Sequence, residues 1–536
     1  MSFVPDTQNK EFQDALNLIQ YTRQSVFLTG KAGTGKSTFL KYICANTKKK
    51  HVVLAPTGIA AINAGGSTLH SFFKLPFYPL LPDDPNFSLQ RGRIHEFFKY
   101  TKPHRKLLEE LELVIIDEIS MVRADIIDAV DRILRVYSRN LREPFGGKQI
   151  LLVGDVFQLE PVVKGDEREI LNRFYPTPYF FSARVFGQID LVSIELQKVY
   201  RQTDSKFIHV LDHIRNNTVG STELQLLNTR YGTQIEQSEA DMYITLATRR
   251  DNVDYINDKK LAELPGDPVT FYGEIMGDFP ESSLPTSQEL VLKPGAQIIF
   301  IKNDFDRRWV NGTIGVISGF DPIEETLYVI TDDGKECDVK RESWRNIRYK
   351  YNEEKKQIEE EELGTFTQYP VRLAWAITVH KSQGLTFSRV VIDFTGGVFA
   401  GGQAYVALSR CTSLEGIQLK KPISRADVFV RPEIVSFSER FNNRTAIDRA
   451  LKQAQADVQY VAAAKAFDKG DFGTFLDEFF KAIHSRYDIE KPNVQRLIRR
   501  KLNIINRLKE ENRALKQAAL EKEKALVKYA REYILM

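Results

Sequence analysis

A nine-residue glycine-rich stretch, GKAGTGKST from Gly30 to Thr38, constrains the fold of this 536-residue chain more than any other feature. It follows the apolar segment SVFLT and precedes a helical pattern that begins near Ser37. Strand, loop and helix in this order are the context of a phosphate-binding loop, and that context disfavours a chance match. The stretch therefore predicts a parallel α/β sheet with a phosphate site at the end of one strand.

The loop also predicts which residues would contact a nucleotide. Its glycines let backbone N–H groups turn toward a β-phosphate, and the helix N-terminus adds a positive dipole. Lys36 would supply a point charge for the β- and γ-phosphates, and the Ser37 hydroxyl would bind magnesium. The predicted cofactors are therefore ATP and Mg²⁺. The predicted nucleotide-binding residues of the loop are Gly30, Gly33, Thr34, Gly35, Lys36, Ser37 and Thr38.

A second acidic element follows the apolar segment LVII, Leu113 to Ile116. Asp117 ends this segment and is placed to hold magnesium together with Ser37, while Glu118 is a candidate base for the attacking water. Asp-Glu pairs are common on protein surfaces, but four apolar residues directly before this pair favour a buried strand end.

A third buried segment, QILLV, ends in Asp155 and Gln158 at the same predicted sheet edge. Gln158 is a candidate sensor of the γ-phosphate. A phosphate loop alone leaves kinases, transporters and motors open, so the acidic residues at the neighbouring strand ends matter for the choice among them.

Short β-branched runs alternate with helical patterns along most of the chain, which predicts an α/β fold class in two successive domains. We expect a first domain at residues 1–190 with a Pro-rich inserted subdomain at about 71–106, and a second at 191–430. The second carries short strands at about 313–368 that predict a small β-barrel, within which the acidic run 353–363 is a solvated strand edge or loop. Residues 431–536 are rich in Ala, Lys, Glu and Leu and predict a helical extension.

Composition indicates an ordinary globular chain. No basic and apolar leader opens the sequence and no apolar run approaches the length of a membrane span, so we expect a cytoplasmic protein, nucleoid-associated if bacterial. The three cysteines, Cys44, Cys337 and Cys411, lack the paired spacing of a zinc site or a disulfide framework. Residues 491–536 hold 13 Lys and Arg against five Asp and Glu, which leaves the preceding part slightly acidic. Because the overall charge of this part offers little attraction, a nucleic-acid partner would have to bind in a local groove.

Further short blocks identify a family. They are ELQKVYRQ at Glu195 to Gln202, AWAITVHKSQGLTF at Ala374 to Phe387 and QAYVALSRCTSLEGI at Gln403 to Ile417. With APTGIAAINAGGSTLHSFF and WVNGTIGVI, their order over residues 5–420 resembles the superfamily 1B helicases, and within them the PIF (petite integration frequency) family. The resemblance implies two tandem RecA-like P-loop domains and an ATP-dependent 5'-to-3' DNA helicase.

The same resemblance assigns roles by position. Gln8 matches the glutamine that reads adenine, Tyr200 the ring beside the nucleotide, and Arg201 and Arg410 the γ-phosphate arginines; we also expect Gly384 at the nucleotide. An arginine from a second domain completes such a site only when the domains close. A surface salt bridge is the alternative for Arg410. The implied partners are single-stranded and forked DNA, in repair, replication, recombination or telomere maintenance, with G-quadruplexes and RNA–DNA hybrids left open.

Single-stranded DNA needs phosphate donors and stacking faces along a groove. We expect these in two loop regions, one per domain: Thr57, Gly58, Thr68 and His70, and then Thr378, His380 and Lys381. Core positions are the alternative for both histidines. The aromatic residues Phe72, Phe73, Phe77 and Tyr78 are interpreted mainly as core of the inserted subdomain, with a duplex-separating wedge as the alternative.

The C-terminal segment from Val494 to Tyr529 carries apolar residues at near-heptad spacing, with Asn512 at a position that can fix coiled-coil register. A helix packed on its own domain, a coiled-coil partner or self-association helix, and an auxiliary nucleic-acid contact all remain open. For the whole chain two rival functions also remain: an ATPase that remodels proteins, and a DNA translocase that does not unwind.

Overall fold

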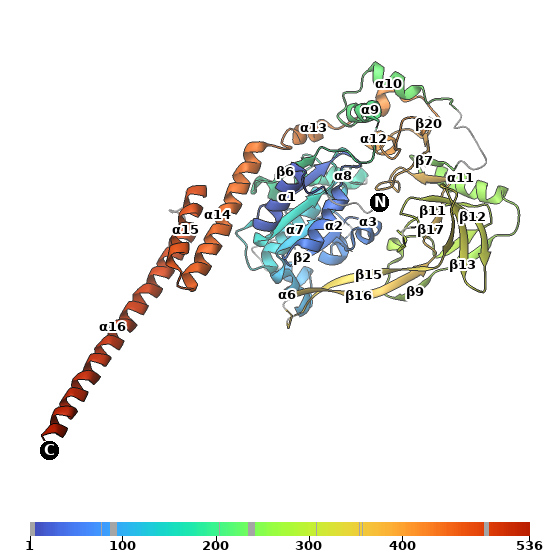
Figure 1. Cartoon of the computed structure of the whole chain (residues 1–536). Coiled ribbons are helices and arrows are strands. Elements are labelled where there is room, and N and C mark those ends of the chain that lie inside the picture. The colour runs from blue at the N-terminus through green and yellow to red at the C-terminus, as the bar shows by residue number, and fades with distance from the viewer. Residues whose placement is uncertain are drawn as a thin grey trace. The chain divides into compact units, whose positions relative to one another are not determined.

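The computed structural model describes residues 6–76, 78–85, 94–163, 165–202, 204–233, 242–306, 308–352, 354–355, 357–486 and 492–535. The chain forms two compact units, Met1–Ala450 and Leu451–Met536 (Figure 1). The predicted wedge or core residue Phe77 lies outside the described residues.

The first half of the larger unit is built on a six-stranded sheet in the order β3-β2-β4-β5-β1-β6, with all neighbours parallel. Its strands are β1 (Val26–Gly30), β2 (His51–Ala55), β3 (Ser67–Thr68), β4 (Leu113–Ile116), β5 (Gln149–Val153) and β6 (Val192–Leu196). The helices of this half are α1 (Lys10–Tyr21), α2 (Lys36–Asn46), α3 (Gly58–Ala64), α4 (Leu69–Phe73), α5 (Ile94–Phe97), α6 (Lys102–Glu110), α7 (Ala124–Tyr137) and α8 (Gly165–Leu171). Strands β1, β4 and β5 are buried at every position, as a helix-covered parallel sheet requires.

Strand β6 shows that the predicted limit at residue 190 is too early. Val192 pairs with Val26, and the strand closes one edge of the first sheet rather than opening a second. A parallel strand can join a sheet far from its sequence neighbours, so its position along the chain did not reveal its partner.

The second half has a four-stranded parallel sheet in the order β18-β7-β19-β20. Its strands are β7 (Ile244–Ala247), β18 (Ala376–Thr378), β19 (Val390–Asp393) and β20 (Ile417–Leu419). The helices are α9 (Ser205–Arg215), α10 (Ser221–Asn228), α11 (Arg250–Glu263) and α12 (Gln403–Leu408), and every residue of α12 is buried.

A β-rich region lies between β7 and β18 in the chain. One sheet has the order β14-β13-β12-β11-β17, a second β15-β16-β9, and a third pairs β10 with β8. The strands are β8 (Val269–Tyr272), β9 (Glu274–Gly277), β10 (Glu289–Leu292), β11 (Gln297–Phe300), β12 (Ile314–Asp321), β13 (Thr326–Thr331), β14 (Glu336–Val339), β15 (Glu342–Asn352), β16 (Gln357–Gln368) and β17 (Val371–Leu373). Strands begin at residue 269, well before the predicted 313. Strand β8 pairs with β10, and β9 pairs with β16 some 90 residues later along the chain.

Strands β15 and β16 form a long hairpin that reaches the first half (Figure 1). Ile347 and Tyr349 on β15 belong to the same hydrophobic cluster as the core of the first sheet. The Val53 N–H of β2 donates to the Tyr349 hydroxyl at 3.3 Å. On the exposed side, Arg345 pairs with Glu362 at 2.7 Å and Arg348 with Glu361 at 2.8 Å. The acidic run thus contributes a solvated strand whose charges are partly neutralised across the hairpin.

Replacing Tyr349 by alanine is expected to lower the free energy of unfolding by about 3 kcal/mol, because the change leaves a cavity where a buried ring stood. Chemical denaturation of the purified chain measures this loss. Arg345→Ala is the matched control on the solvent side of the same strand, with an expected change within about 0.5 kcal/mol. Equal stability of the two variants would contradict docking of the hairpin on the first half.

Residues 431–450 also belong to the larger unit, so the predicted extension boundary at 431 is too early. Phe437 on α13 (Pro432–Ser438) stacks on Phe181 with ring centroids 4.4 Å apart. Arg431 pairs with Glu160 at 2.7 Å. Local composition indicated the helix correctly, but it could not show that these side chains complete the core of the first half.

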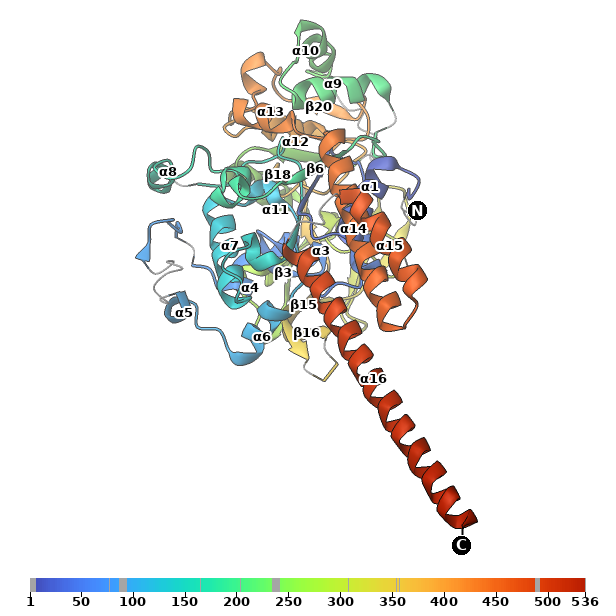
Figure 2. The same cartoon turned by 90° about the vertical axis from the view of Figure 1, so that its left-hand side faces the viewer.

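The smaller unit holds the C-terminal part of α14 (Arg444–Asp468), together with α15 (Phe472–Arg486) and α16 (Pro492–Ile534). Tyr460, Phe479 and Ile498 contribute to a small core that joins the three helices. Figure 2 shows α16 continuing as a single helix past the other two. Across the described parts of both units, no helix combines the length and the apolar character needed to cross a membrane.

Candidate nucleotide site and strand-binding loops

The glycine-rich loop connects β1 directly to α2. Gly33 and Gly35 adopt positive φ angles of 79° and 90°, which glycine accepts without strain. A Cβ atom on Gly33 would lie 2.4 Å from the Cβ of Arg201. The glycines therefore allow the loop to turn, and Gly33 also leaves room for the segment around Arg201, more than 160 residues later in the chain.

The Lys36 ammonium group folds back into the loop. Its Nζ donates to the backbone carbonyls of Gly30 at 2.6 Å and Lys31 at 3.0 Å. Desolvation lowers the pKa of Lys36, while the carboxylates of Asp155 and Glu118 oppose that shift. A phosphate group entering the loop would offer this cation a charged partner in place of two neutral carbonyls.

A cavity of about 340 Å³ lies against the loop. Residues from both halves of the larger unit surround it, since the loop and the ends of β4 and β5 contribute one side and the segments after β18 and α12 the other. The lining residues are Ala32, Gly33, Thr34, Gly35, Lys36, Ser37, Thr38, Glu118, Gln158, Tyr200, Arg201, Gly384, Thr386 and Arg410. Most of the predicted nucleotide residues thus line one space, and Thr386 is an addition that the sequence did not indicate.

The acidic pair follows β4. The Asp117 carboxylate accepts from the Glu118 N–H at 2.9 Å, and Glu118 has a positive φ of 49°. Desolvation, followed by the charge of Asp117, raises the pKa of Glu118 to about 7 against the opposing charges of Lys36 and Arg410. Glu118 reaches the cavity, whereas Asp117 is absent from its lining. An acid with a pKa near neutrality is suited to exchange protons at physiological pH.

A polar network joins the ends of β4 and β5 to the second half. The Gln383 side chain donates to Glu118 at 2.9 Å and to Gln158 at 3.1 Å. Asp155 accepts from the Gln158 amide at 3.4 Å and from Arg215 of α9 at 3.1 Å. Gln383 and Arg215 were not among the predicted site residues, because only the tertiary fold brings their loops to this edge.

The two predicted arginines lie on either side of Ser409. Arg201 donates to the Ser409 carbonyl at 3.2 Å. Arg410 is 1% exposed, and its guanidinium donates to carbonyls of Val406, Ser382 and Leu385. Burial and the neighbouring Arg201 lower the pKa of Arg410 to about 9, against opposing contributions from Tyr405, Glu118 and Asp155. The salt-bridge alternative for Arg410 is not what the structure shows, since its described partners are backbone carbonyls and a serine hydroxyl.

Two further contacts hold the second half against the phosphate loop. The Ala32 N–H donates to the Tyr405 hydroxyl of α12 at 3.0 Å, and Lys31 pairs with Asp212 of α9 at 2.7 Å. The Tyr405 ring is buried and the ion pair is partly exposed. The phosphate loop is therefore held by contacts from the opposite half as well as by its own strand and helix.

Gln8 and Tyr200 differ in position. Tyr200 lines the cavity, and its backbone N–H donates to the Gly33 carbonyl at 2.8 Å. Gln8 is exposed and is not among the lining residues. Its neighbour Asp6 joins this segment to the site by accepting from the Tyr200 hydroxyl at 3.0 Å and from Lys198 at 2.8 Å. The predicted adenine reader thus lies beside the site rather than at its wall.

In the first predicted strand-binding loop, two hydroxyls cap helices. Thr57 accepts from the Ala60 N–H at 3.2 Å and Thr68 accepts from the Ser71 N–H at 3.1 Å. Gly58 packs so closely on Ser283 that a Cβ atom would lie 2.6 Å from its hydroxyl oxygen. His70 is half-buried, and burial with the Arg123 charge lowers its pKa. These residues order the loop, and the β-rich region covers part of it.

In the second predicted loop, Thr378 is buried and accepts from the Lys381 N–H at 3.2 Å. The His380 ring stacks on Phe399 with centroids 6.3 Å apart, and burial lowers its pKa. Phe399 is 60% exposed. The Lys381 side chain is exposed, so this loop offers both a charge and a flat aromatic face to solvent.

The described aromatic residues at the start of the inserted segment differ in burial. Phe72 and Phe73 are buried in the main core of the first half, where Phe72 approaches Tyr349 of the hairpin. Tyr78 is 51% exposed. Phe72 and Phe73 are therefore core residues, but of the first half as a whole rather than of a separate inserted subdomain, and Tyr78 is a surface ring.

A phosphate loop, an acidic strand end and two arginines around one cavity, between two parallel α/β halves, define a tandem-domain P-loop nucleotide-binding protein. The family model for PIF1-like helicase matches residues 4–225. The chain is 31% identical to the ATP-dependent DNA helicase Pif1 of Bdellovibrio bacteriovorus over 80% of its own length and 91% of that protein. The chain belongs to the PIF1-like helicase family.

Other relatives are longer. The chain is 33% identical to the human ATP-dependent DNA helicase PIF1 over 74% of its own length but only 58% of that protein. Among solved structures, Bacteroides Pif1 in complex with ADP-AlF4 is 42% identical, covers 80% of this chain and 96% of its own, and superposes with a TM-score of 0.73. Bacteroides Pif1 bound to single-stranded DNA is similar at the same identity, with a TM-score of 0.58. The two α/β halves are thus the tandem RecA-like domains of this family, followed by a helical region.

Proposed function

We propose that this chain is an ATP-dependent DNA helicase that moves 5'-to-3' along single-stranded DNA and unwinds duplex DNA. The observation that carries the proposal is the single cavity that receives Lys36 from one half and Arg410 from the other. Relatives named ATP-dependent DNA helicases support it, as do the Bacteroides Pif1 structures with single-stranded and forked DNA. Such an activity would serve DNA repair, replication, recombination or telomere maintenance, and G-quadruplexes and RNA–DNA hybrids are further candidate substrates.

Each half contributes different chemistry to hydrolysis. Lys36 and the loop N–H groups bind the phosphates, and Glu118 accepts a proton from the attacking water. Gln158 positions that water or the γ-phosphate. Arg201 and Arg410 neutralise the negative charge that grows on the transferred phosphoryl group, so hydrolysis requires the halves to be closed.

Ser37 and Asp117 would hold Mg²⁺. Hydroxyl and carboxylate oxygens are the hard ligands that this ion prefers, and phosphate oxygens would complete its shell. Ser37 lines the cavity, and Asp117 is close enough to Lys36 for the lysine charge to lower its pKa against the desolvation that raises it. When bound, the ion would neutralise charge on the β- and γ-phosphates.

Movement along DNA would follow from the two strand-binding loops. The first loop, with Thr57, Gly58, Thr68 and His70, belongs to one half, and the second, with Thr378, His380 and Lys381, to the other. If each loop binds one phosphate of the DNA strand, opening and closing of the nucleotide cavity changes the distance between the two bound phosphates. The DNA strand would then advance once per ATP.

Steady-state ATPase with and without single-stranded DNA, followed by strand displacement, tests the proposal. We expect DNA to stimulate hydrolysis and a fork with a 5' single-stranded tail to be unwound. Unwinding that needs a 3' tail would refute the direction. DNA-stimulated hydrolysis without displacement of a short duplex would indicate a translocase, and hydrolysis that ignores DNA would indicate a different class of ATPase.

Hydrolysis should depend on the charge of Glu118. Because the pKa of Glu118 is raised to about 7, the basic form is present above that pH and is lost as the pH falls. We expect kcat at saturating ATP and DNA to fall about tenfold for each pH unit below neutrality. Glu118→Gln should lower kcat by about 10²- to 10⁴-fold. If that variant retains the acidic limb of the pH profile, another group is responsible for it.

A further inference from the structure

The N-terminal part of α16 carries an uninterrupted positive charge. From residue 492 to 509 the sequence contains six Lys and Arg and no Asp or Glu. Acidic residues return only from Glu510 onward, where they alternate with lysines. Most of the +8 charge of the C-terminal segment is therefore concentrated over the first turns of this helix rather than spread along it.

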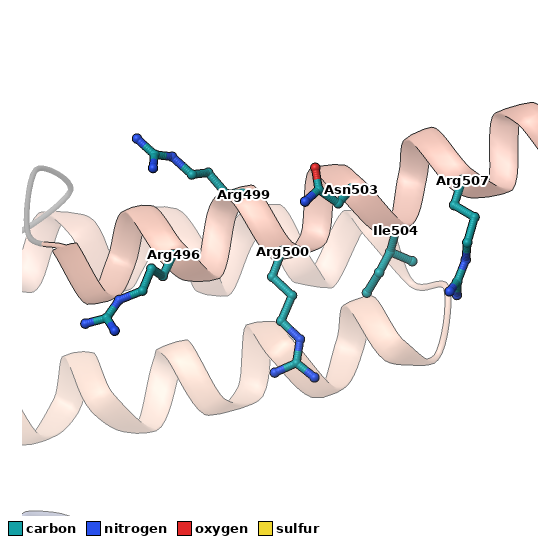
Figure 3. Close-up of a pocket in the computed structure, with 6 residues that line it drawn as sticks. All are labelled: Arg496, Arg499, Arg500, Asn503, Ile504 and Arg507. Atoms are coloured by element: carbon teal, nitrogen blue, oxygen red, sulfur yellow. The ribbon is translucent and has the colours of Figure 1, made fainter.

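Four of these residues are arginines on one side of α16, and we call them the arginine face: Arg496, Arg499, Arg500 and Arg507. With Asn503 and Ile504 they line an open hollow of about 490 Å³ (Figure 3). In Figure 3 the Arg500, Ile504 and Arg507 side chains point to the same side of the helix. Eleven residues separate the first and last arginine, which corresponds to roughly 16 Å at 1.5 Å per residue.

The described fold accounts for only part of this charge. Lys501, which lies between the arginines in sequence, pairs with Asp468 and sits 4.7 Å from the Phe467 ring centre, so it helps to fix α16 on α14. Arg507 lies 3.7 Å from Glu511, whereas Arg499 and Arg500 are exposed and form no ion pair within the part of the chain that the structure describes. Like charges close together on one helix face repel one another, and Arg499 and Arg500 can therefore accept an anionic partner outside this chain.

We propose that the arginine face binds the phosphate backbone of DNA without sequence preference and acts as an anchor separate from the motor's own strand-binding loops. The inference rests on the proposed function, since a DNA motor meets this polyanion continuously. Guanidinium groups bind phosphate oxygens in pairs, and a 16 Å face spans about five phosphates of one strand at roughly 3.4 Å each. A membrane surface fits less well, because a helix that lies on lipid needs a broad apolar face and Ile504 is the one apolar residue of the hollow.

The test compares two triple variants of the full chain. Arg499→Gln, Arg500→Gln and Arg507→Gln remove three charges from the arginine face. Lys522→Gln, Lys524→Gln and Lys528→Gln remove three charges from the acid-containing part of the same helix and serve as the matched control. Glutamine is a good helix former, so both variants should keep α16 intact, which circular dichroism can verify.

Fluorescence anisotropy with a 20-base-pair duplex, at salt concentrations from about 50 to 200 mM, gives the result. For the arginine variant we expect Kd to rise at least about tenfold at low salt and the slope of log Kd against log salt to fall by about two to three. The control should change Kd less than about twofold. Equal effects of the two variants, or no effect of the first, would overturn the inference.

Two more measurements separate this inference from the proposed function and from other partners. ATPase kcat at saturating single-stranded DNA should be unchanged in the arginine variant, because the motor site is intact. If the wild-type chain shows no DNA-stimulated ATPase but the arginine variant still loses DNA affinity, the proposed function fails and the anchor stands. Binding to vesicles of phosphatidylserine and phosphatidylcholine that needs the arginines, with DNA affinity unaffected, would assign the face to lipid instead.

Discussion

Arg410→Ala is expected to lower kcat for ATP hydrolysis by about 10³-fold while the affinity for single-stranded DNA stays within about twofold. A positioned arginine that neutralises charge on a transferred phosphoryl group contributes 10³- to 10⁵-fold to the rate. Arg410 lines the nucleotide cavity from the second half and is 1% exposed, so solvent cannot replace it. Steady-state ATPase at saturating DNA measures the effect.

The control for this variant must allow for a structural role, because Arg410 also donates to backbone carbonyls. Arg230→Ala is suitable, since Arg230 likewise donates to two carbonyls of the second half, those of Ile417 and Glu415, but does not line the cavity. Its kcat should stay within about threefold of wild type if such contacts are structural only. Activity of Arg410→Ala within tenfold of wild type would remove this arginine from the hydrolytic site.

Lys36→Ala is expected to abolish ATP hydrolysis and to leave DNA binding intact. The Lys36 ammonium group is the loop's only side-chain cation at the cavity wall, and without it the β- and γ-phosphates lose their point charge. Nucleotide binding by isothermal titration and DNA binding by anisotropy separate the two functions.

Lys41→Ala provides the matched comparison, because Lys41 lies on the same helix α2 but is exposed. Its ATPase should be near that of wild type. Hydrolysis that persists in Lys36→Ala at more than about one per cent of the wild-type rate would mean that the catalytic cavity lies elsewhere.

The parts of this protein that could be predicted from sequence are those whose physical cause is local. Gly33, Gly35 and Lys36 lie within four residues of one another, and the apolar runs before Asp117 and Gln158 mark strand ends directly. The fold class followed from the same alternation of strands and helices. The domain limits were less accurate. Strand β6 and helix α13 belong to the first half because they contact β1 and Phe181, and the local sequence does not show these contacts.

The same distinction applies to the site. Arg201 and Arg410 were predicted from family motifs, whereas Gln383, Tyr405 and Arg215 were missed although they contact the loop or its acidic partners. These residues acquire their positions only when two halves of the chain meet. Thr57 and Thr68 illustrate a different limit, since the hydroxyls expected to bind DNA cap helices in the structure, and a side chain that caps a helix looks the same in sequence as one that binds phosphate.

The β15–β16 hairpin has a mechanical consequence. The chain passes between the two halves twice, near Tyr200 and before α13, and at a further point Tyr349 of the hairpin contacts β2. Connections at several separated places restrict how far the two halves can move apart or twist against each other. Opening and closing of the nucleotide cavity would then be confined to a narrow range of relative movements of the two halves.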